Sequence, residues 1–134
     1  MSARSRTEEH VGEWKLTLRA DTLAELFAEG ARVIARSGGR AGGEPGAWEP
    51  VELESTDRAT LLADWLNELV GRSEVAGRAY RDVRDLSITG GRLRAEVRGT
   101  PVAEWGSPVK AATYHGLRVE QDGARWTAVV LLDV

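Results

Sequence analysis

Apolar side chains in this chain of 134 residues repeat with two different periods, and the change of period limits the folds that the chain can form. Residues 22–37 and 61–71 carry apolar side chains three and four positions apart, which is the spacing of an amphipathic helix. Residues 14–18, 48–55 and most of 80–134 instead alternate apolar and polar side chains, as strands with one buried face do. The pattern therefore predicts two helices among several strands.

Local signals predict where these elements begin and end. A capping-box pattern at 22–25 begins the first helix, the glycines at 38–39 end it, and residues 55–57 supply N-cap candidates for the second helix. Two-residue turn signals at 90–91 and 122–123 predict hairpins in the last third of the chain. Because strands joined by hairpins run antiparallel, the predicted fold class is α+β. Its order is β-α-β-α-β-β-β-β, with two helices packed on a mainly antiparallel sheet.

The length and the distribution of apolar residues predict a single domain over residues 9–134. Residues 1–8 are polar and charged, and we expect them to form a disordered tail. Residues 37–47 are rich in glycine and carry no apolar anchor, which predicts a flexible surface loop. The segment 129–132 is apolar on both faces, so its strand is expected in the centre of the sheet.

Composition excludes several functional classes. The chain has no cysteine and two histidines, which excludes disulfides, thiolate metal sites and a three-histidine metal centre. A formal net charge of −3 argues against stable, sequence-independent binding to nucleic acid, which requires a basic face. The apolar runs are shorter than the ~20 residues of a membrane span, and no apolar core follows the N-terminal basic residues as in a secretory signal. We therefore expect a cytoplasmic protein that does not act on a membrane.

Three polar clusters are candidates for chemistry. One is residues 8–13 (EEHVGE) before the first strand, the second is residues 110–115 (KAATYH) in a late strand, and the third is Asp133 directly after an apolar strand. Carboxylate oxygens suit hard cations such as calcium, magnesium or manganese. Each cluster also has a purely structural interpretation. Residues 8–13 could be a solvated strand start, residues 110–115 a strand with a packed tyrosine, and Asp133 a charge where its strand reaches solvent. The common hydrolase and phosphate-loop motifs are absent from the sequence, which argues against an autonomous enzyme.

Four segments of the chain, taken in order, follow the motifs of one known protein family. The family's E-H-x-A-D pattern corresponds to EHVGE at 9–13, and its W-L-N-E-L helix core to the same letters at 65–69. Its K-A-x-T-Y-H strand corresponds to KAATYH at 110–115, and its C-terminal V-L-D-V strand to LLDV at 131–134. Taken together, the four segments resemble the archease family, and the resemblance covers the chain from Glu9 onward.

The resemblance implies an accessory protein of a GTP-dependent RNA ligase that acts in tRNA splicing and RNA repair. Such a protein promotes guanylylation of the ligase and keeps the ligase turning over. It implies a bound divalent metal (calcium, magnesium or manganese) with Glu13 and Asp133 as ligands and Val134 as a backbone or terminal-carboxylate ligand. Lys110 is expected beside this acidic cluster. At Glu13 the chain departs from the family, which has an aspartate there.

The histidines of the two motifs, His10 and His115, are expected to support this site. Other functions stay open at this point. The chain could be a chaperone-like binding module without metal that docks through its helical face or through the loops of Trp48 and Trp105. It could be a small enzyme that uses Glu13 and His10 as an acid–base pair, or a divergent paralogue that no longer acts on the ligase. The sequence leaves the oligomeric state and the ligase-docking surface undetermined.

Overall fold

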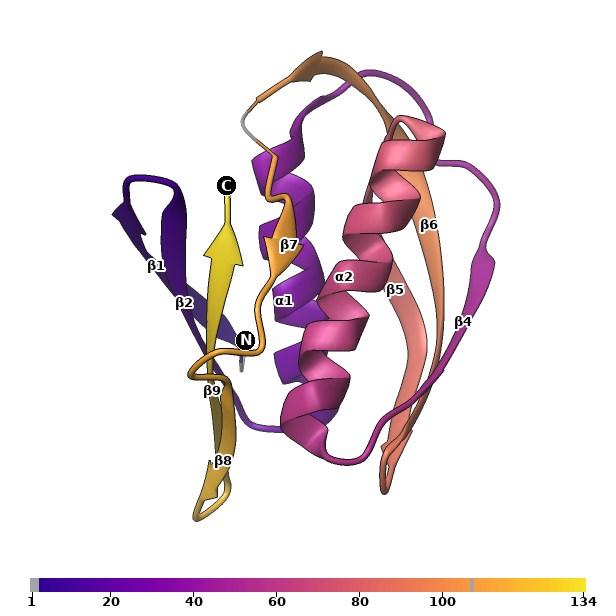
Figure 1. Ribbon diagram of the computed structural model, residues 1–134. Coiled ribbons are helices and arrows are strands. Elements are labelled where there is room, and N and C mark those ends of the chain that lie inside the picture. Colours follow the sequence, from indigo (N-terminus) through magenta and orange to yellow (C-terminus); the bar gives the residue numbers. More distant parts are fainter. Residues whose placement is uncertain (1–2, 107) are drawn as a thin grey trace.

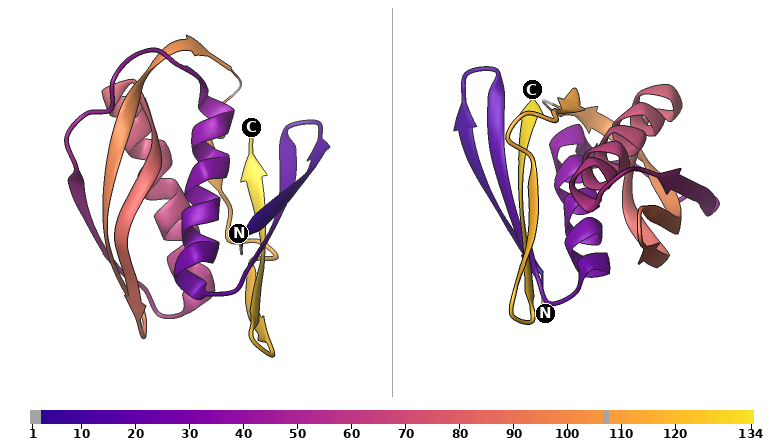
Figure 2. Two further views of the ribbon diagram at one scale, coloured as in Figure 1. Left: turned by 180° about the vertical axis from the view of Figure 1, so that it is seen from behind. Right: turned by 60° about the horizontal axis from the view of Figure 1, so that its bottom comes forward.

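The computed structural model describes residues 3–106 and 108–134, which form two antiparallel sheets with two helices between them (Figures 1 and 2). The predicted α+β class is confirmed, and the structure adds that the strands divide between two sheets. In chain order the elements are β1 (Arg4–His10), β2 (Glu13–Ala20), α1 (Leu23–Gly38), β3 (Gly39–Ala41), β4 (Glu49–Glu54), α2 (Arg58–Ala76), β5 (Arg78–Thr89), β6 (Arg92–Trp105), β7 (Ala111–Ala112), β8 (Arg118–Asp122) and β9 (Arg125–Asp133).

The first sheet contains β1, β2, β9, β7 and β8. Its centre is β9, which pairs with β2 on one side and with the short strands β7 and β8 on the other. The apolar segment within β9 therefore lies in a central strand, as its sequence predicts. Alternate residues of β2 and β9, including Leu16, Leu18, Val130 and Leu132, are buried against the helices, so the other set of residues forms an outer face.

The second sheet is built around β6. Strand β5 pairs with one edge of β6, while β4 and β3 pair with successive parts of the other edge. The irregular alternation in the sequence of β5 corresponds to two register shifts along its pairing with β6, between Ala79 and Asp82 and between Arg84 and Ser87. Both sheets thus cover the helical layer with one face and leave the other face outside (Figure 2).

The two helices begin where the capping signals predict. The Thr22 side chain accepts a hydrogen bond from the Glu25 backbone N–H at 3.1 Å, and the Asp57 carboxylate accepts one from the Thr60 N–H at 2.8 Å. Helix α2 continues through Gly71, where the sequence predicted its end, to Ala76. It ends at Gly77, which has the left-handed conformation (φ +68°) that glycine adopts without strain.

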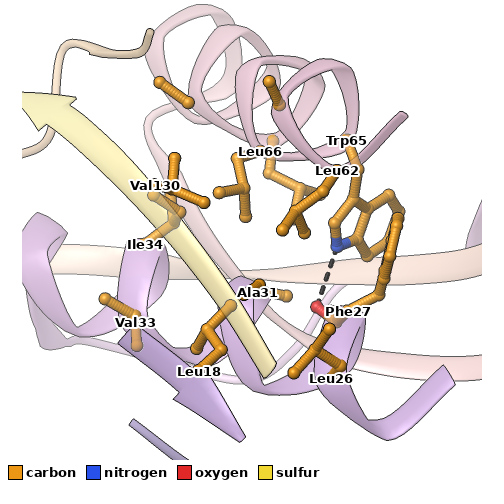
Figure 3. Packing of buried hydrophobic residues seen from close by; sticks show 14 of the residues in the cluster. Leu18, Leu26, Phe27, Ala31, Val33, Ile34, Leu62, Trp65, Leu66 and Val130 are labelled. Atoms are coloured by element: carbon orange, nitrogen blue, oxygen red, sulfur yellow. Dashed lines mark hydrogen bonds between the residues drawn. The ribbon is translucent and has the colours of Figure 1, made fainter. Parts of the chain in front are cut away.

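One core joins both helices and both sheets (Figure 3). The Trp65 side chain is fully buried at its centre, and its indole N–H donates a hydrogen bond to the Phe27 carbonyl at 2.9 Å. This bond satisfies the single polar atom of the Trp65 side chain and ties α2 to α1. No helix in the described part of the chain is long and apolar enough to cross a membrane.

Two expectations about irregular segments are wrong. Residues 4–8 of the predicted disordered tail belong to β1, which pairs with β2 over its whole length; residues 1 and 2 lie outside the described residues. Polar strands on a sheet edge carry too little apolar pattern to be recognised, which explains the error. The glycine-rich segment 37–47 is not a free loop, since β3 pairs with β6 and the N–H groups of Gly42 and Gly46 continue along that strand.

Candidate functional site

Two carboxylates stand side by side where the first sheet ends. Glu13 begins β2 and Asp133 ends β9, and the two residues are direct cross-strand partners. Direct partners in an antiparallel pair have Cβ atoms about 4.5–5.5 Å apart and point to the same face. Both side chains are exposed on the outer face. We call this pair the carboxylate end of the first sheet.

Residues of the β1–β2 turn surround the carboxylate end. His10 is the cross-strand partner of Glu13, so the imidazole shares the row of the two carboxylates. The Val134 N–H donates to the Gly12 carbonyl at 3.2 Å, which extends the pairing of β2 and β9 past Asp133. Val11, at the tip of the turn, is fully exposed. The strand register therefore brings the backbones of His10, Glu13, Asp133 and Val134 to the same end of the sheet.

A short strap, which we define as residues 108–113, runs along the other side of Asp133. The Lys110 backbone N–H donates to the Asp133 carbonyl at 2.7 Å, and Ala111 is the cross-strand partner of Asp133. This places the Lys110 backbone next to that of Asp133. The Lys110 ammonium group is exposed and makes no ion pair within residues 3–106 and 108–134.

Polar side chains from both helices hold the strap in position. The Ser37 hydroxyl of α1 accepts a hydrogen bond from the Val109 N–H at 3.1 Å. The Asn67 side chain of α2 makes two hydrogen bonds to Ala112: its amide donates to the Ala112 carbonyl at 3.0 Å and its oxygen accepts from the Ala112 N–H at 2.8 Å. Asn67 therefore replaces the neighbouring strand that β7 lacks on this side.

Asp64 provides a third attachment at the end of the strap. Its carboxylate accepts hydrogen bonds from the Tyr114 hydroxyl and from the Ser55 hydroxyl. The hydrogen bond to Asp64 is the main cause that raises the pKa of Tyr114 above its ordinary value of 10.0, and desolvation adds to it. Sequence reasoning placed Asn67 in a helix-core motif and passed over Asp64. An asparagine inside a helix is unfavourable unless its side chain has a partner, and this was the available signal.

The other predicted residues lie elsewhere. His115 is exposed in the turn between β7 and β8, outside the row of Glu13 and Asp133. Trp48 is half-buried on the second sheet, with the guanidinium groups of Arg84 and Arg98 stacked 4.2 and 4.6 Å from its ring centre. Trp105 is 49% exposed, so it is the more accessible of the two tryptophans proposed as docking anchors.

The carboxylate end fits a hard cation only in part. Two adjacent carboxylates on one face supply oxygen ligands of the kind that calcium, magnesium and manganese prefer. Within residues 3–106 and 108–134, however, there is no group of three or more acidic, histidine or cysteine side chains that could hold a metal ion. Water or a partner molecule would have to complete the coordination of a cation held by Glu13 and Asp133.

The fold and this site define a small α+β protein that presents two carboxylates and a strapped lysine at the end of an antiparallel sheet. Residues 6–134 match the model of the archease protein family. A protein archease of Methanopyrus kandleri is 32% identical over 134 residues, which cover 94% of this chain and 96% of that protein. One from Thermococcus gammatolerans is 35% identical over 100 residues, 68% of this chain and 70% of the relative. The chain belongs to the archease family.

Two solved structures share the fold. The crystal structure of a Thermotoga maritima protein, described as an archease and possible chaperone, superimposes with a TM-score of 0.67 over 96% of both chains at 22% identity. The solution structure of protein 1598 from Methanobacterium thermoautotrophicum gives a TM-score of 0.71 at 20% identity, and covers 97% of this chain and 98% of that one. The division into two sheets around a helical layer is therefore a fold found in solved structures.

Proposed function

We propose that this protein activates a GTP-dependent RNA ligase by promoting guanylylation of the ligase and its multiple turnover, and that it does so with its carboxylate end. The observation that carries the proposal is the direct pairing of Glu13 with Asp133 at an exposed end of the sheet, in a chain that belongs to the archease family. The protein itself is proposed as an activator and not as an enzyme.

The residues of the carboxylate end have distinct parts in this proposal. Glu13 and Asp133 would hold a divalent cation, and Glu13 would do so with a side chain one methylene longer than aspartate. When bound there, a cation would supply charge neutralisation at phosphate oxygens during nucleotidyl transfer. The strap keeps Lys110 next to this charge, so that an anionic phosphate group meets an ammonium group as well. The exposed tip at Val11 gives the site a point of contact with the ligase.

A guanylylation assay with the cognate ligase tests the proposal. The wild-type protein should increase the rate of ligase guanylylation and allow each ligase molecule to seal more than one RNA. In Asp133→Asn this stimulation should fall by about 10- to 100-fold, because removal of even an outer-shell partner of a bound metal lowers metal affinity or activity by that factor. Glu120→Gln, which removes an exposed carboxylate from β8 in the same sheet, is the matched control. A wild-type protein that leaves ligase guanylylation unchanged would overturn the proposal.

Metal binding requires a measurement that does not depend on the ligase. Calorimetric titration of manganese or calcium should give heat with the wild type and none with Asp133→Asn, while Glu13→Asp should retain binding because it restores the residue of the family motif. If wild type and Asp133→Asn give the same heats, the metal part of the proposal is wrong even where activation is observed.

A metal-independent binding module is the second candidate. It is favoured by the incomplete set of ligands in the described residues and by the exposure of Val11 and Trp105. The Thermotoga maritima relative is described as a possible chaperone, which agrees with such a role. In this case ligase capture by the immobilised protein should persist in a chelator and should weaken with Trp105→Ala. Loss of capture in the chelator would favour the metal-dependent function.

A further inference from the structure

The outer face of β1 and β2 gathers positive charge. Arg4 and Arg6 of β1 and Lys15 and Arg19 of β2 lie on this face, opposite the side that packs on the helices. Arg4 and Arg19 are direct cross-strand partners. We call these four residues the basic face. Figures 1 and 2 show β1 and β2 at the edge of the molecule, where no other element covers them.

The charge of the basic face is neutralised only in part within the described residues. Glu8 makes a 3.6 Å ion pair with Arg6 and is the direct cross-strand partner of Lys15. Within residues 3–106 and 108–134, Arg4, Lys15 and Arg19 have no carboxylate within ion-pair distance. Like charges directly opposite each other destabilise a sheet, so the pairing of Arg4 with Arg19 does not serve the stability of the fold. In a chain of net charge −3, this concentration of cations requires another explanation.

The basic face is also hollowed. A cavity of about 420 Å³ opens on it, lined by the four cations together with Glu8, Thr17 and Ser5. The Thr17 hydroxyl shares the face of the cations, whereas the Ser5 hydroxyl lies on the helix side of the sheet and accepts a hydrogen bond from Arg36. Arginine, lysine and hydroxyl side chains are the groups that contact phosphate oxygens in nucleic-acid complexes. The lining contains no aromatic or large apolar side chain on which a base could stack. The hollow therefore suits a phosphate backbone and does not suit base recognition.

We infer that the basic face binds phosphate groups along the backbone of a single RNA strand, without reading its sequence. This inference rests on the proposed function, because an RNA ligase brings RNA ends close to the protein that activates it. Glu13 and Arg19 stand six residues apart in β2, so the carboxylate end and the basic face are separated by roughly 20 Å along the strand. The carboxylate end then serves the nucleotidyl transfer, while the basic face holds RNA further from the reacting end.

Fluorescence anisotropy of a labelled 12-nucleotide single-stranded RNA tests the contact without ligase. Non-specific binding of this kind is weak and depends on salt, with a slope of about −0.7 per phosphate contact for single strands. Four contacts predict about a 50-fold loss of affinity between 50 and 200 mM salt, and two contacts predict about a 7-fold loss. Arg4→Gln/Arg19→Gln removes two of the four contacts. The loss of affinity between 50 and 200 mM salt should therefore fall from about 50-fold to about 7-fold.

The matched control is Arg92→Gln/Arg94→Gln, which removes two exposed arginines from the second sheet. It should keep the wild-type salt dependence, and circular dichroism should show that both double variants are folded. Equal salt slopes for the two double variants would overturn the inference. Binding of polyglutamate as tightly as RNA would also overturn it, since the face would then suit an acidic protein.

The ligase assay separates this inference from the proposed function. Guanylylation requires no RNA, so Arg4→Gln/Arg19→Gln should stimulate guanylylation as the wild type does and should raise the KM for RNA in the sealing reaction. An unchanged KM overturns the inference and leaves the proposed function intact. A wild-type protein without any effect on guanylylation overturns the proposed function, whereas the anisotropy result stands independently.

Discussion

The two sheets of this protein use their surface charges differently. The second sheet pairs its arginines with carboxylates on neighbouring strands, and the distances are short: Arg84–Glu96 2.9 Å, Arg92–Glu54 3.1 Å, Arg94–Glu52 3.0 Å and Arg98–Asp82 2.8 Å. Two of these arginines also stack on Trp48. These four cations are therefore satisfied within the chain.

The first sheet instead leaves most charges of its outer face unpaired within the described residues. Two carboxylates, Glu13 and Asp133, occupy one end of its outer face, and the basic face occupies the other part of β1 and β2. Exposed ion pairs contribute only about 0–1 kcal/mol each, so the difference concerns function more than stability. The first sheet presents charges that a partner can neutralise, whereas the second sheet presents few.

The largest predicted effect concerns the edge of the first sheet. Strand β7 has two residues, and Asn67 supplies the hydrogen bonds that a further strand would supply. Asn67→Leu leaves the Ala112 N–H and carbonyl without these partners, and unsatisfied groups of this kind cost about 1–3 kcal/mol each. We therefore expect urea denaturation to show a loss of about 2–4 kcal/mol in the free energy of unfolding.

Asn67→Asp is the matched variant, since it keeps an acceptor for the Ala112 N–H and loses only the donor. Its destabilisation should be smaller than that of Asn67→Leu. If Asn67→Leu unfolds at the same urea concentration as the wild type, the strap is not held by α2, and the position of Lys110 needs another explanation.

The comparison of the two sheets predicts that equivalent arginine-to-glutamate substitutions change the stability of the protein in opposite directions. Arg19→Glu turns the like-charged pair with Arg4 into an opposite-charged pair, and should stabilise the protein by about 0.2–1 kcal/mol. Arg94→Glu places a glutamate opposite Glu52 and breaks their ion pair, so it should destabilise by a similar amount. Thermal unfolding at low salt measures both changes, and added salt should reduce both of them. A shift of both variants in the same direction would contradict the proposed difference between the sheets.

Much of this arrangement follows from local sequence. The periods of apolar residues and the caps at Thr22 and Asp57 predict both helices because these signals act within a few residues. The family resemblance alone already assigned Glu13 and Asp133 to one predicted site, although they are 120 positions apart in the chain. Their pairing follows from the register of β2 with β9.

The remaining features depend on contacts between distant segments. No local sequence signal specifies that β2 pairs with β9 or that β4 pairs with β6. The division into two sheets was therefore not predictable from the spacing of apolar residues. Strand β1 has no buried apolar face by which it could be recognised. The basic face was missed for the same reason, because it appears only when β1 and β2 are aligned.

The smallest predicted effect compares the two tyrosines, the only ones in the chain. Tyr80 belongs to the second sheet and Tyr114 follows the strap. Burial is the main cause that raises the pKa of Tyr80, with its hydrogen bond to Glu49 second, while the hydrogen bond to Asp64 is the main cause for Tyr114. Absorbance at alkaline pH should therefore show both phenols ionising above 10. Asp64→Asn should lower the pKa of Tyr114 and leave Tyr80 unchanged.

The effect on stability has a definite sign. The pKa of Tyr114 is raised in the folded protein. The contribution of the neutral Tyr114 phenol to stability is therefore fully present below the ordinary pKa of 10.0, and it is lost as the pH rises through the raised value. Tyr114 is 54% exposed, so solvent weakens this contribution. Tyr114→Phe should accordingly lose less stability above pH 10 than the wild type does, whereas Tyr80 continues to titrate. A Tyr114→Phe variant with the same alkaline loss as the wild type would show that Asp64 does not hold the end of the strap through this hydroxyl.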